Sequence, residues 1–332
     1  MRTVALGGGG YTTPDPILSP GVRNFLEGSK FGRLGLQAGR KARQLLRRLR
    51  DPVQHKVWIR QFALPLRNAI LLNRPLEISI DGILVYLAPR GGVAGDIWTG
   101  LRGEQRDLSF FLNVLDPTMI FFDIGANAGL FAIAAAKKVG GMEIFAFEPC
   151  SWTCRLLKRN LLLNRLADIN VIQTALGDSV GEGVLQINAR GRDGLNTLGQ
   201  STHPDRHVVG QEKVRVTTLD VFINEHKVPR VDVIKVDVQG AELMVFRGAQ
   251  NLLERADAPI ILFEGYGYNT RRFGYHPVEI LWFLESCGYT LFSFHGETGE
   301  ISELKPEYQY NSMVIAAKPG HLAYAKLQAG LK

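Results

Sequence analysis

The chain has few cysteines and no recognisable export signal. Only three cysteines, Cys150, Cys154 and Cys287, occur in 332 residues. Three are too few for a disulfide framework, and an odd number fits a reducing compartment. No histidine or cysteine lies near Cys150 and Cys154 at a zinc-binding spacing, so we expect both to be packing residues. The amino-terminal segment lacks the continuous apolar stretch of a signal peptide, and we expect a cytoplasmic protein.

Outside one short segment, the chain has almost equal numbers of basic and acidic residues. The formal net charge is +7, but residues 30–50 contain eight of the 39 Lys and Arg residues and no acid. Without that segment the chain has 31 basic and 32 acidic residues. Because a nucleic-acid-binding domain carries its basic residues on the folded surface, we expect no nucleic-acid partner.

Residues 37–50 have the pattern of a basic amphipathic helix. Ala42, Leu45, Leu46 and Leu49 are spaced at i, i+3, i+4 and i+7, with Arg and Lys on both sides of the apolar stripe. Such a helix either lies on an anionic membrane surface, which would make the protein peripheral to a membrane, or docks on its own domain or a partner. Both interpretations fit the sequence.

Strand-like and helix-like segments alternate from Met119 onward. Seven apolar runs have the length of buried strands, and they are residues 119–123, 143–147, 169–173, 231–236, 259–264, 289–294 and 312–318. The expected helices between them are residues 128–138, 151–164, 218–226, 241–254 and 277–287. This alternation predicts a doubly wound α/β domain with a mostly parallel, seven-stranded sheet.

Two further segments do not follow this alternation. Residues 76–87 have the pattern of a β-hairpin around Asp81-Gly82, a dipeptide suited to a tight turn. The polar residues 186–213 contain no clear strand or helix signal, and we interpret them as a loop inserted near the edge of the sheet.

The first strand of the domain ends in a glycine turn that begins with an acid. Asp123 ends the apolar run, and Gly125 and Gly129 follow with the spacing Gly-x-x-x-Gly. A dinucleotide site would instead have Gly-x-Gly-x-x-Gly, which lets the backbone approach a pyrophosphate. A carboxylate before the first glycine would repel a pyrophosphate but could receive a cationic or amino-acid-bearing ligand. A nicotinamide oxidoreductase is therefore the less favoured alternative.

A second acid, Glu148, ends the next strand, 25 residues after Asp123. A carboxylate at this place can accept hydrogen bonds from both hydroxyls of a ribose. Adenosine with a zwitterionic tail suits both acids, so the pattern predicts S-adenosylmethionine as the cofactor. The alternative is that the two acids only cap helices.

Acids also stand at the ends of two later strands. Lys235 and Asp237 are two residues apart on one strand and share a face, and Glu264 ends the following strand. We expect Asp237 and Glu264 to face the crevice where a substrate enters, near Lys235. A carboxylate there could take or orient the proton of an acceptor hydroxyl, which we favour, or several carboxylates could hold Mg²⁺. The Lys235–Asp237 pair could also only hold the strand end together.

Several segments, in this order, resemble motifs of the FkbM-type S-adenosylmethionine-dependent methyltransferases. They are DIGANAG (123–129), FAFEP (145–149), KRNLLLN (158–164), ALGD (175–178), VTTLD (216–220), IKVDVQGAE (234–242) and ILFEG (261–265). The resemblance extends over roughly residues 76–318. Gln239 departs from the pattern, because the family usually has Glu at this place.

The resemblance implies a class I methyltransferase fold and O-methylation of a saccharide, a glycolipid or a natural product. It implies that the glycine turn holds the methionine end of the cofactor, that the acid after the second strand holds the ribose, and that residues after the third strand lie along the adenine. The implied cofactor residues are Asp123, Gly125, Asn127, Gly129, Glu148, Ala175, Leu176 and Asp178. By analogy alone, we expect Asn196 and Thr197 of the inserted loop to contact the substrate or the cofactor. Tyr266, in an aromatic cluster after Glu264, could stack on a sugar ring.

The resemblance also suggests how the chain is divided. The three parts are a mobile, basic and partly helical extension (1–75), an FkbM-like methyltransferase domain (76–318) and a carboxyl-terminal tail (319–332). The expected acceptor is a small molecule or a glycan. Gln239 and the basic extension leave one alternative open, a non-catalytic member that binds a cofactor or a partner.

Overall fold

The structure is a computed structural model that describes residues 75–80, 83–88, 108, 111–189, 193–199, 208–264, 267–295, 300–304, 313–321 and 324. Several predictions lie outside the described residues: the basic helix at 37–50 with its membrane contact, nearly all of the extension 1–75, most of the tail 319–332, and Tyr266. Within the described part of the chain, no helix combines the length and apolar character needed to cross a membrane.

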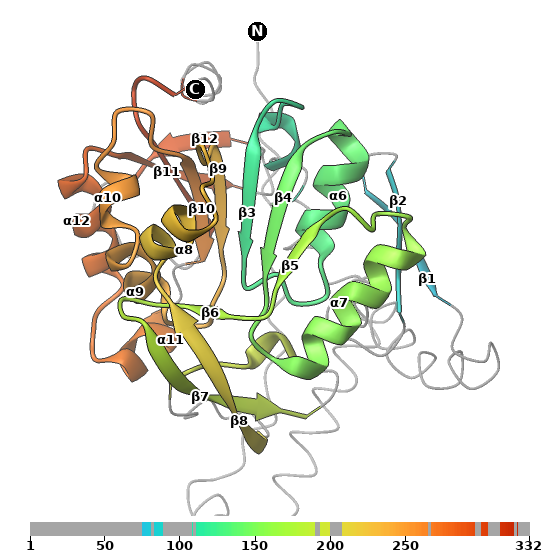
Figure 1. The fold of residues 1–332 in the computed structure, drawn as a ribbon. Helices are drawn as coiled ribbons and strands as arrows, with labels where there is room; N and C mark the ends of the chain where they lie inside the picture. The colour runs from blue at the N-terminus through green and yellow to red at the C-terminus, as the bar shows by residue number, and fades with distance from the viewer. Residues whose placement is uncertain are drawn as a thin grey trace, which may run out of the picture. The chain divides into compact units, whose positions relative to one another are not determined.

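An eight-stranded sheet lies at the centre of the fold (Figure 1). Its strands are β3 (Ile120–Ile124), β4 (Glu143–Phe147), β5 (Asn170–Ile172), β9 (Val233–Val236), β10 (Ile260–Glu264), β11 (Thr290–His295), β12 (Glu300–Glu303) and β13 (Met313–Ala317). Their order across the sheet is β12-β11-β13-β10-β9-β3-β4-β5. The five strands from β10 to β5 pair in parallel, whereas β13, β11 and β12 join the sheet through antiparallel pairs.

All seven predicted strands occur in this sheet, which confirms the doubly wound, mostly parallel α/β fold. The predicted number of strands was wrong, because β12 adds an eighth at the edge beside β11. β12 is short and polar (EISE), and Ile301 is its buried apolar residue. An edge strand has a neighbour on one side only, so such a weak apolar pattern is sufficient for it.

Helices cover both faces of the sheet, because adjacent strand residues point to opposite sides. On the side of Phe121 lie α6 (Leu130–Val139), α7 (Ser151–Leu163) and the predicted hairpin, which forms β1 (Leu76–Ile80) and β2 (Ile83–Leu87). On the side of Phe122 lie α8 (Leu219–Glu225), α9 (Glu242–Arg247), α10 (Gln250–Leu253) and α12 (Val278–Ser286). Short helices, α11 (Gly267–Thr270) and η2 (Arg271–Phe273), follow β10.

The single helix predicted at 241–254 was wrong, because Gly248 divides it into α9 and α10. The Gly248 carbonyl accepts a hydrogen bond from the Asp220 N–H at 3.0 Å. A Cβ at Gly248 would lie 2.0 Å from the Gly177 carbonyl oxygen. The chain therefore bends where α8 and the segment after β6 come close to its backbone.

A separate three-stranded sheet follows β5, in the order β6-β8-β7. It consists of β6 (Ala175–Leu176), β7 (Gly181–Asn188) and β8 (Val208–Thr217), and a short helical turn, η1 (Asp193–Leu195), lies between β7 and β8. The interpretation of 186–213 as a loop was therefore wrong at both ends, where residues belong to β7 and β8. β7 and β8 have a weak apolar pattern in the sequence, because few of their side chains are buried. Leu185 and Val214 pack with Cys150 and Ala175 in a small buried cluster.

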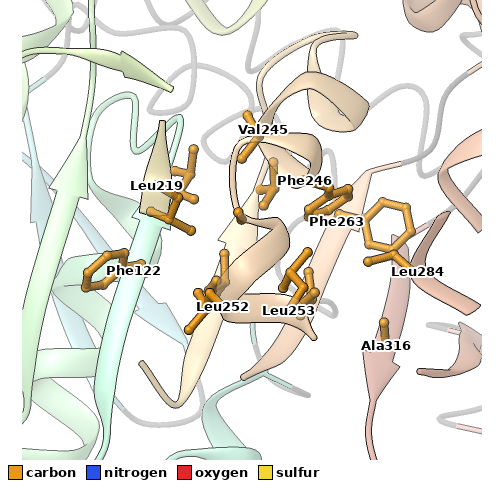
Figure 2. Packing of buried hydrophobic residues seen from close by; sticks show 14 of the residues in the cluster. Phe122, Leu219, Val245, Phe246, Leu252, Leu253, Phe263, Leu284 and Ala316 are labelled. Atoms are coloured by element: carbon orange, nitrogen blue, oxygen red, sulfur yellow. The ribbon is translucent and has the colours of Figure 1, made fainter. Parts of the chain in front are cut away.

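Aromatic rings fill the core on the side of Phe122. The Phe122 ring lies 4.9 Å from that of Phe145, 5.4 Å from Phe147 and 6.0 Å from Phe222 of α8, measured between centroids. Figure 2 shows part of this core, with Phe122 on the sheet and Leu219 and Leu253 on the helices that cover it. These contacts hold α8 and the neighbouring helices against the strands that position the pocket described below.

Replacing this ring tests how strongly the core holds the fold. Phe122→Ala should lower the free energy of unfolding by about 3–5 kcal/mol, because a fully buried aromatic ring is lost and a cavity remains. Denaturant titration of the whole chain measures this change. Leu162→Ala, at a residue of α7 that is 69% exposed, is the control and should change the free energy by less than about 0.5 kcal/mol. Equal losses in the two variants would contradict the assigned core.

Candidate functional site

A pocket opens at the carboxyl ends of β3, β4 and β9, where the strand order of the sheet reverses. From β3 the chain passes through α6 to β4 on one side, whereas β9 pairs on the other side of β3. Ligands of doubly wound sheets bind at such a switch point. The pocket has a volume of about 610 Å³ including its open mouth, and residues between β7 and β8 form one of its walls.

Eight residues singled out from the sequence line this pocket. They are Gly125, Asn127, Glu148, Ala175, Leu176, Asn196, Thr197 and Asp237. Five others lie elsewhere: Asp123 and Gly129 are the buried ends of the glycine turn, Lys235 is beneath it, Glu264 is at the end of β10, and the exposed Asp178 bonds with Ser179.

Other lining residues were not singled out from the sequence. They include Phe147, Pro149, Thr174, Leu185, Leu198, Val238 and Ala241. These residue types are common at strand ends and in loops, so no local signal distinguishes them. Gln239 also lines the pocket, and its departure from the family pattern was the one available sign.

The turn after β3 lies against the end of β9 and requires glycine. Gly125 has a φ of 73°, and a Cβ there would lie 2.0 Å from the carbonyl oxygen of Asp237. Any side chain at Gly125 would therefore strain the turn and push the loop after β9 away. The N–H groups of Gly125 and Ala126 both donate to the Phe147 carbonyl, at 3.0 and 2.9 Å, which attaches the turn to the end of β4.

Glu148 receives two backbone hydrogen bonds that fix its carboxylate. Its Oε2 accepts from the Asn127 N–H at 3.0 Å, and its Oε1 accepts from the Cys150 N–H at 2.9 Å. Asn127 has a φ of 49°, and its side-chain oxygen accepts from the Ala128 N–H at 2.6 Å. Each carboxylate oxygen has more than one acceptor position, so this orientation still allows hydrogen bonds to a ligand.

Asp123 and Lys235 form a buried ion pair beneath the turn. The Lys235 Nζ lies 3.4 Å from Asp123 Oδ1 and donates to the Gly125 carbonyl at 2.9 Å. Asp123 Oδ2 accepts a hydrogen bond from the Ala132 N–H, in the first turn of α6, at 3.2 Å. Side chains of this pair are 6% exposed or less, so both residues act on the pocket through the turn rather than from its surface.

Acidic neighbours keep Lys235 charged. Burial by itself lowers the pKa of the Lys235 ammonium, but the carboxylates of Asp123, Asp237 and Glu264 together raise this pKa above its ordinary value. A protonated lysine cannot act as a base. Lys235 instead holds the glycine turn in place through its hydrogen bond to the Gly125 carbonyl.

Asp237 lies at the pocket surface among hydrogen-bond donors. Its side chain is 30% exposed, and its Oδ2 is 3.8 Å from the Lys235 Nζ. Its Oδ1 accepts a hydrogen bond from Gln239 Nε2 at 2.9 Å, and Gln239 Oε1 accepts in turn from Asn269 Nδ2 at 3.4 Å. Where the family usually has a second acid, this chain therefore places an amide that donates to Asp237.

The wall between β7 and β8 is attached to the same loop. Thr197 Oγ1 donates to the Gln239 carbonyl at 3.0 Å, and Thr197 also pairs with Gln186 of β7 in an isolated bridge. Asn196 Oδ1 accepts from the Asn188 N–H at 2.8 Å, which fixes its side chain beside the pocket. Of the two residues singled out by analogy, Thr197 is hydrogen-bonded to the loop that carries Asp237, and Asn196 lines the same pocket.

A buried acid supports the loop between β9 and α9. Glu242 is 3% exposed, and its Oε1 accepts from the Val238 N–H at 3.2 Å and the Gly240 N–H at 3.1 Å. Tyr275 OH donates to the Gly240 carbonyl at 2.6 Å from the other direction. Desolvation raises the pKa of Glu242 to about 7.

No cluster of three or more His, Cys, Asp or Glu residues that could hold a metal ion occurs in the described ranges. The neighbours of the Asp237 carboxylate include the ammonium of Lys235 at 3.8 Å and the amide of Gln239 at 2.9 Å. A divalent cation at Asp237 would meet this ammonium.

The Methyltransferase FkbM domain matches residues 123–291, just over half of the chain. The chain belongs to the FkbM methyltransferase family. The matched region begins at the acid before the glycine turn and ends within β11, so it includes every element that lines the pocket. As an FkbM methyltransferase domain, the chain has the class I fold that the motif order implied.

Curated relatives are similar to part of the chain. Hexuronic acid methyltransferase AglP of Haloferax volcanii is 29% identical over 173 residues, which cover 50% of this chain and 65% of that protein. Methyltransferase sdnD of Sordaria araneosa is 31% identical over 152 residues, covering 38% and 58%. The 31-O-demethyl-FK506 methyltransferase FkbM of Streptomyces tacrolimicus is 29% identical over 171 residues, covering 44% and 64%. The chain thus spans less than two thirds of the length of each.

The raised pKa of Glu242 predicts that the stability of this FkbM-family chain depends on pH. Between about pH 4.5 and 7 the folded chain retains the Glu242 proton while the unfolded chain loses it, so stability falls as the pH rises. The Glu242→Gln side chain does not titrate, so this variant does not show that decrease in stability. Relative to wild type, the free energy of unfolding of Glu242→Gln should therefore rise by about 3 kcal/mol across this range.

Denaturant titrations of both proteins at several pH values between 4.5 and 8 measure this difference. Contributions of all other titrating groups cancel in the comparison. A difference that stays constant with pH would show that Glu242 titrates normally in the folded chain.

Proposed function

We propose that this protein is an S-adenosylmethionine-dependent O-methyltransferase acting on a hydroxyl of a saccharide, a glycolipid or a natural product. One observation carries the proposal: the pocket at the switch point combines a Gly-x-x-x-Gly turn with the fixed carboxylate of Glu148. Family membership supports methyl transfer. Its relatives include a hexuronic acid methyltransferase and a 31-O-demethyl-FK506 methyltransferase, and this range of acceptors is consistent with a sugar or natural-product hydroxyl.

In this proposal the donor lies across the carboxyl ends of β3 and β4. Glu148 receives the ribose hydroxyls, because both of its oxygens are already aimed by backbone N–H groups. Ala175 and Leu176 offer an apolar surface to the adenine, and the turn at Gly125 and Asn127 receives the amino-acid end. Asp123 and Gly129, at the two ends of this turn, serve by fixing its path.

Asp237 is the residue placed to handle the acceptor hydroxyl. S-adenosylmethionine, when bound, would supply the electrophilic methyl group, and S-adenosylhomocysteine would be the leaving group. Asp237 accepts a hydrogen bond from that hydroxyl and takes its proton during the attack. Lys235 and Gln239 orient the Asp237 carboxylate, and no step requires a metal ion.

Binding measurements test the donor site. The full chain should bind S-adenosylhomocysteine and not NAD in calorimetry. Glu148→Gln should weaken S-adenosylhomocysteine binding about tenfold or more, because its amide N–H₂ would face a backbone N–H and would lose an acceptor for the ribose. Binding of NAD without S-adenosylhomocysteine would overturn the proposed function.

Activity measurements test the role of Asp237. Transfer of labelled methyl groups to uronic-acid-containing glycans and polyhydroxylated macrolides identifies a working acceptor. With it, Asp237→Asn should lower kcat about 100-fold or more, because an amide cannot take the proton, while S-adenosylhomocysteine binds within about threefold of wild type. Asp257→Asn, at a surface residue paired with Arg255, is the control and should leave kcat unchanged. An unchanged kcat in Asp237→Asn, or loss of activity with a chelator, would contradict the assignment.

A further inference from the structure

The Asn160 side chain hydrogen-bonds both the segment after hairpin β1–β2 and the glycine turn. Asn160 of α7 is fully buried, and its carboxamide bridges two backbone segments. Its Oδ1 accepts a hydrogen bond from the Ala88 N–H at 2.8 Å, and its Nδ2 donates to the Ala128 carbonyl at 2.8 Å. Ala88 follows β2 directly, whereas Ala128 belongs to the turn that follows β3.

We propose that Asn160 is a positioning residue of the donor site and that it makes hairpin β1–β2 part of that site. The inference rests on the proposed function, since it concerns the same S-adenosylmethionine pocket. The hairpin lies before the region that matches the family, at residues 76–87 against 123–291. The family match therefore does not contain the element to which Asn160 ties the turn.

The contacts connect Asn160 to the pocket in three steps. Asn160 holds the carbonyl of Ala128, and the side chain of Asn127 holds the N–H of the same residue at 2.6 Å. The Asn127 N–H in turn donates to Glu148 Oε2 at 3.0 Å. Because Ala128 is held on both sides, the neighbouring Asn127 can keep its left-handed conformation, with a φ of 49°. Asn160 thus sets the path of the backbone that aims the Glu148 carboxylate.

Removal of the Asn160 carboxamide would affect the backbone at both ends of the bridge, at Ala88 and at Ala128. A buried N–H and a buried C=O would each lose their partner, and such groups are costly to leave unpaired. The turn can relieve this cost by moving its Ala128 carbonyl toward water. That movement would also shift Asn127 and disturb the geometry at Glu148.

Asn164 provides a matched control one helical turn later. Its Oδ1 accepts from the Tyr86 N–H at 2.9 Å, and its Nδ2 donates to the Tyr86 carbonyl at 2.6 Å. It also donates to the Asn160 carbonyl of its own helix at 2.7 Å. Asn164 therefore clamps the same hairpin with the same chemical group, but its bonds go to the strand and the helix. A comparison of the two residues separates docking of the hairpin from positioning of the turn.

The experiment compares Asn160→Leu and Asn164→Leu in the full chain, with S-adenosylhomocysteine as the probe in calorimetry. Leucine has nearly the shape of asparagine and adds no charge. Both variants should unfold at a lower temperature than wild type. Asn160→Leu should weaken S-adenosylhomocysteine binding about tenfold or more, whereas Asn164→Leu should change it by less than about threefold.

Hydrogen exchange gives a readout that a purely structural role would not change. If the hairpin and the donor site are coupled, S-adenosylhomocysteine should slow exchange of the backbone amides in residues 83–88 of the wild type, because coupling between sites is reciprocal. The same slowing should be kept in Asn164→Leu and lost in Asn160→Leu. Asn160→Ser and Asn164→Ser, which keep a polar group at each position, serve the same comparison if a leucine variant does not fold.

Three results would overturn the inference or its basis. Wild-type affinity in Asn160→Leu would show that the carboxamide does not position the turn. Equal weakening in the Asn160 and Asn164 variants would assign the effect to hairpin docking as a whole. A wild-type chain that binds no S-adenosylhomocysteine would instead overturn the proposed function on which the inference rests.

Discussion

The buried ammonium of Lys235 is the interaction on which the site depends. It connects the ends of β3 and β9, because it pairs with Asp123, donates to the Gly125 carbonyl and lies 3.8 Å from Asp237. These three groups would otherwise place negative charge and an unpaired carbonyl together in a region of low dielectric. With the lysine charged, the glycine turn can lie directly against the loop after β9, and the pocket forms between them.

Two neutral amide side chains also hold groups of the site in position. Gln239 donates to the pocket-facing acid Asp237, and Asn160 holds the carbonyl of Ala128 in the glycine turn. An amide can donate and accept at once, so it can join two backbone segments or aim a carboxylate without adding charge. This property suits a pocket that already contains two acids, Glu148 and Asp237.

Much of the fold could be predicted because its strands are buried on both faces. Such strands appear as continuous apolar runs, and all seven runs became strands of the central sheet. The elements that were missed are held by other forces. β7 and β8 bury few side chains and pair mainly through backbone hydrogen bonds, β12 has one neighbour, and the break at Gly248 arises from contacts with distant backbone.

Seven strands of the sheet, the acidic glycine turn at 123–129 and the acid at Glu148 could be predicted from the sequence, because each depends on neighbours in the chain. Which acids reach the pocket follows only from how the strands pack in the folded chain. Asp123 and Asp237 look alike in sequence, since each ends a buried strand before a glycine turn. In the folded chain Asp123 is fully buried beneath the turn, whereas Asp237 is part of the pocket wall. The side of the turn on which a carboxylate lies depends on how β3 and β9 pack through Lys235, and residues 112 positions apart in the chain make that contact.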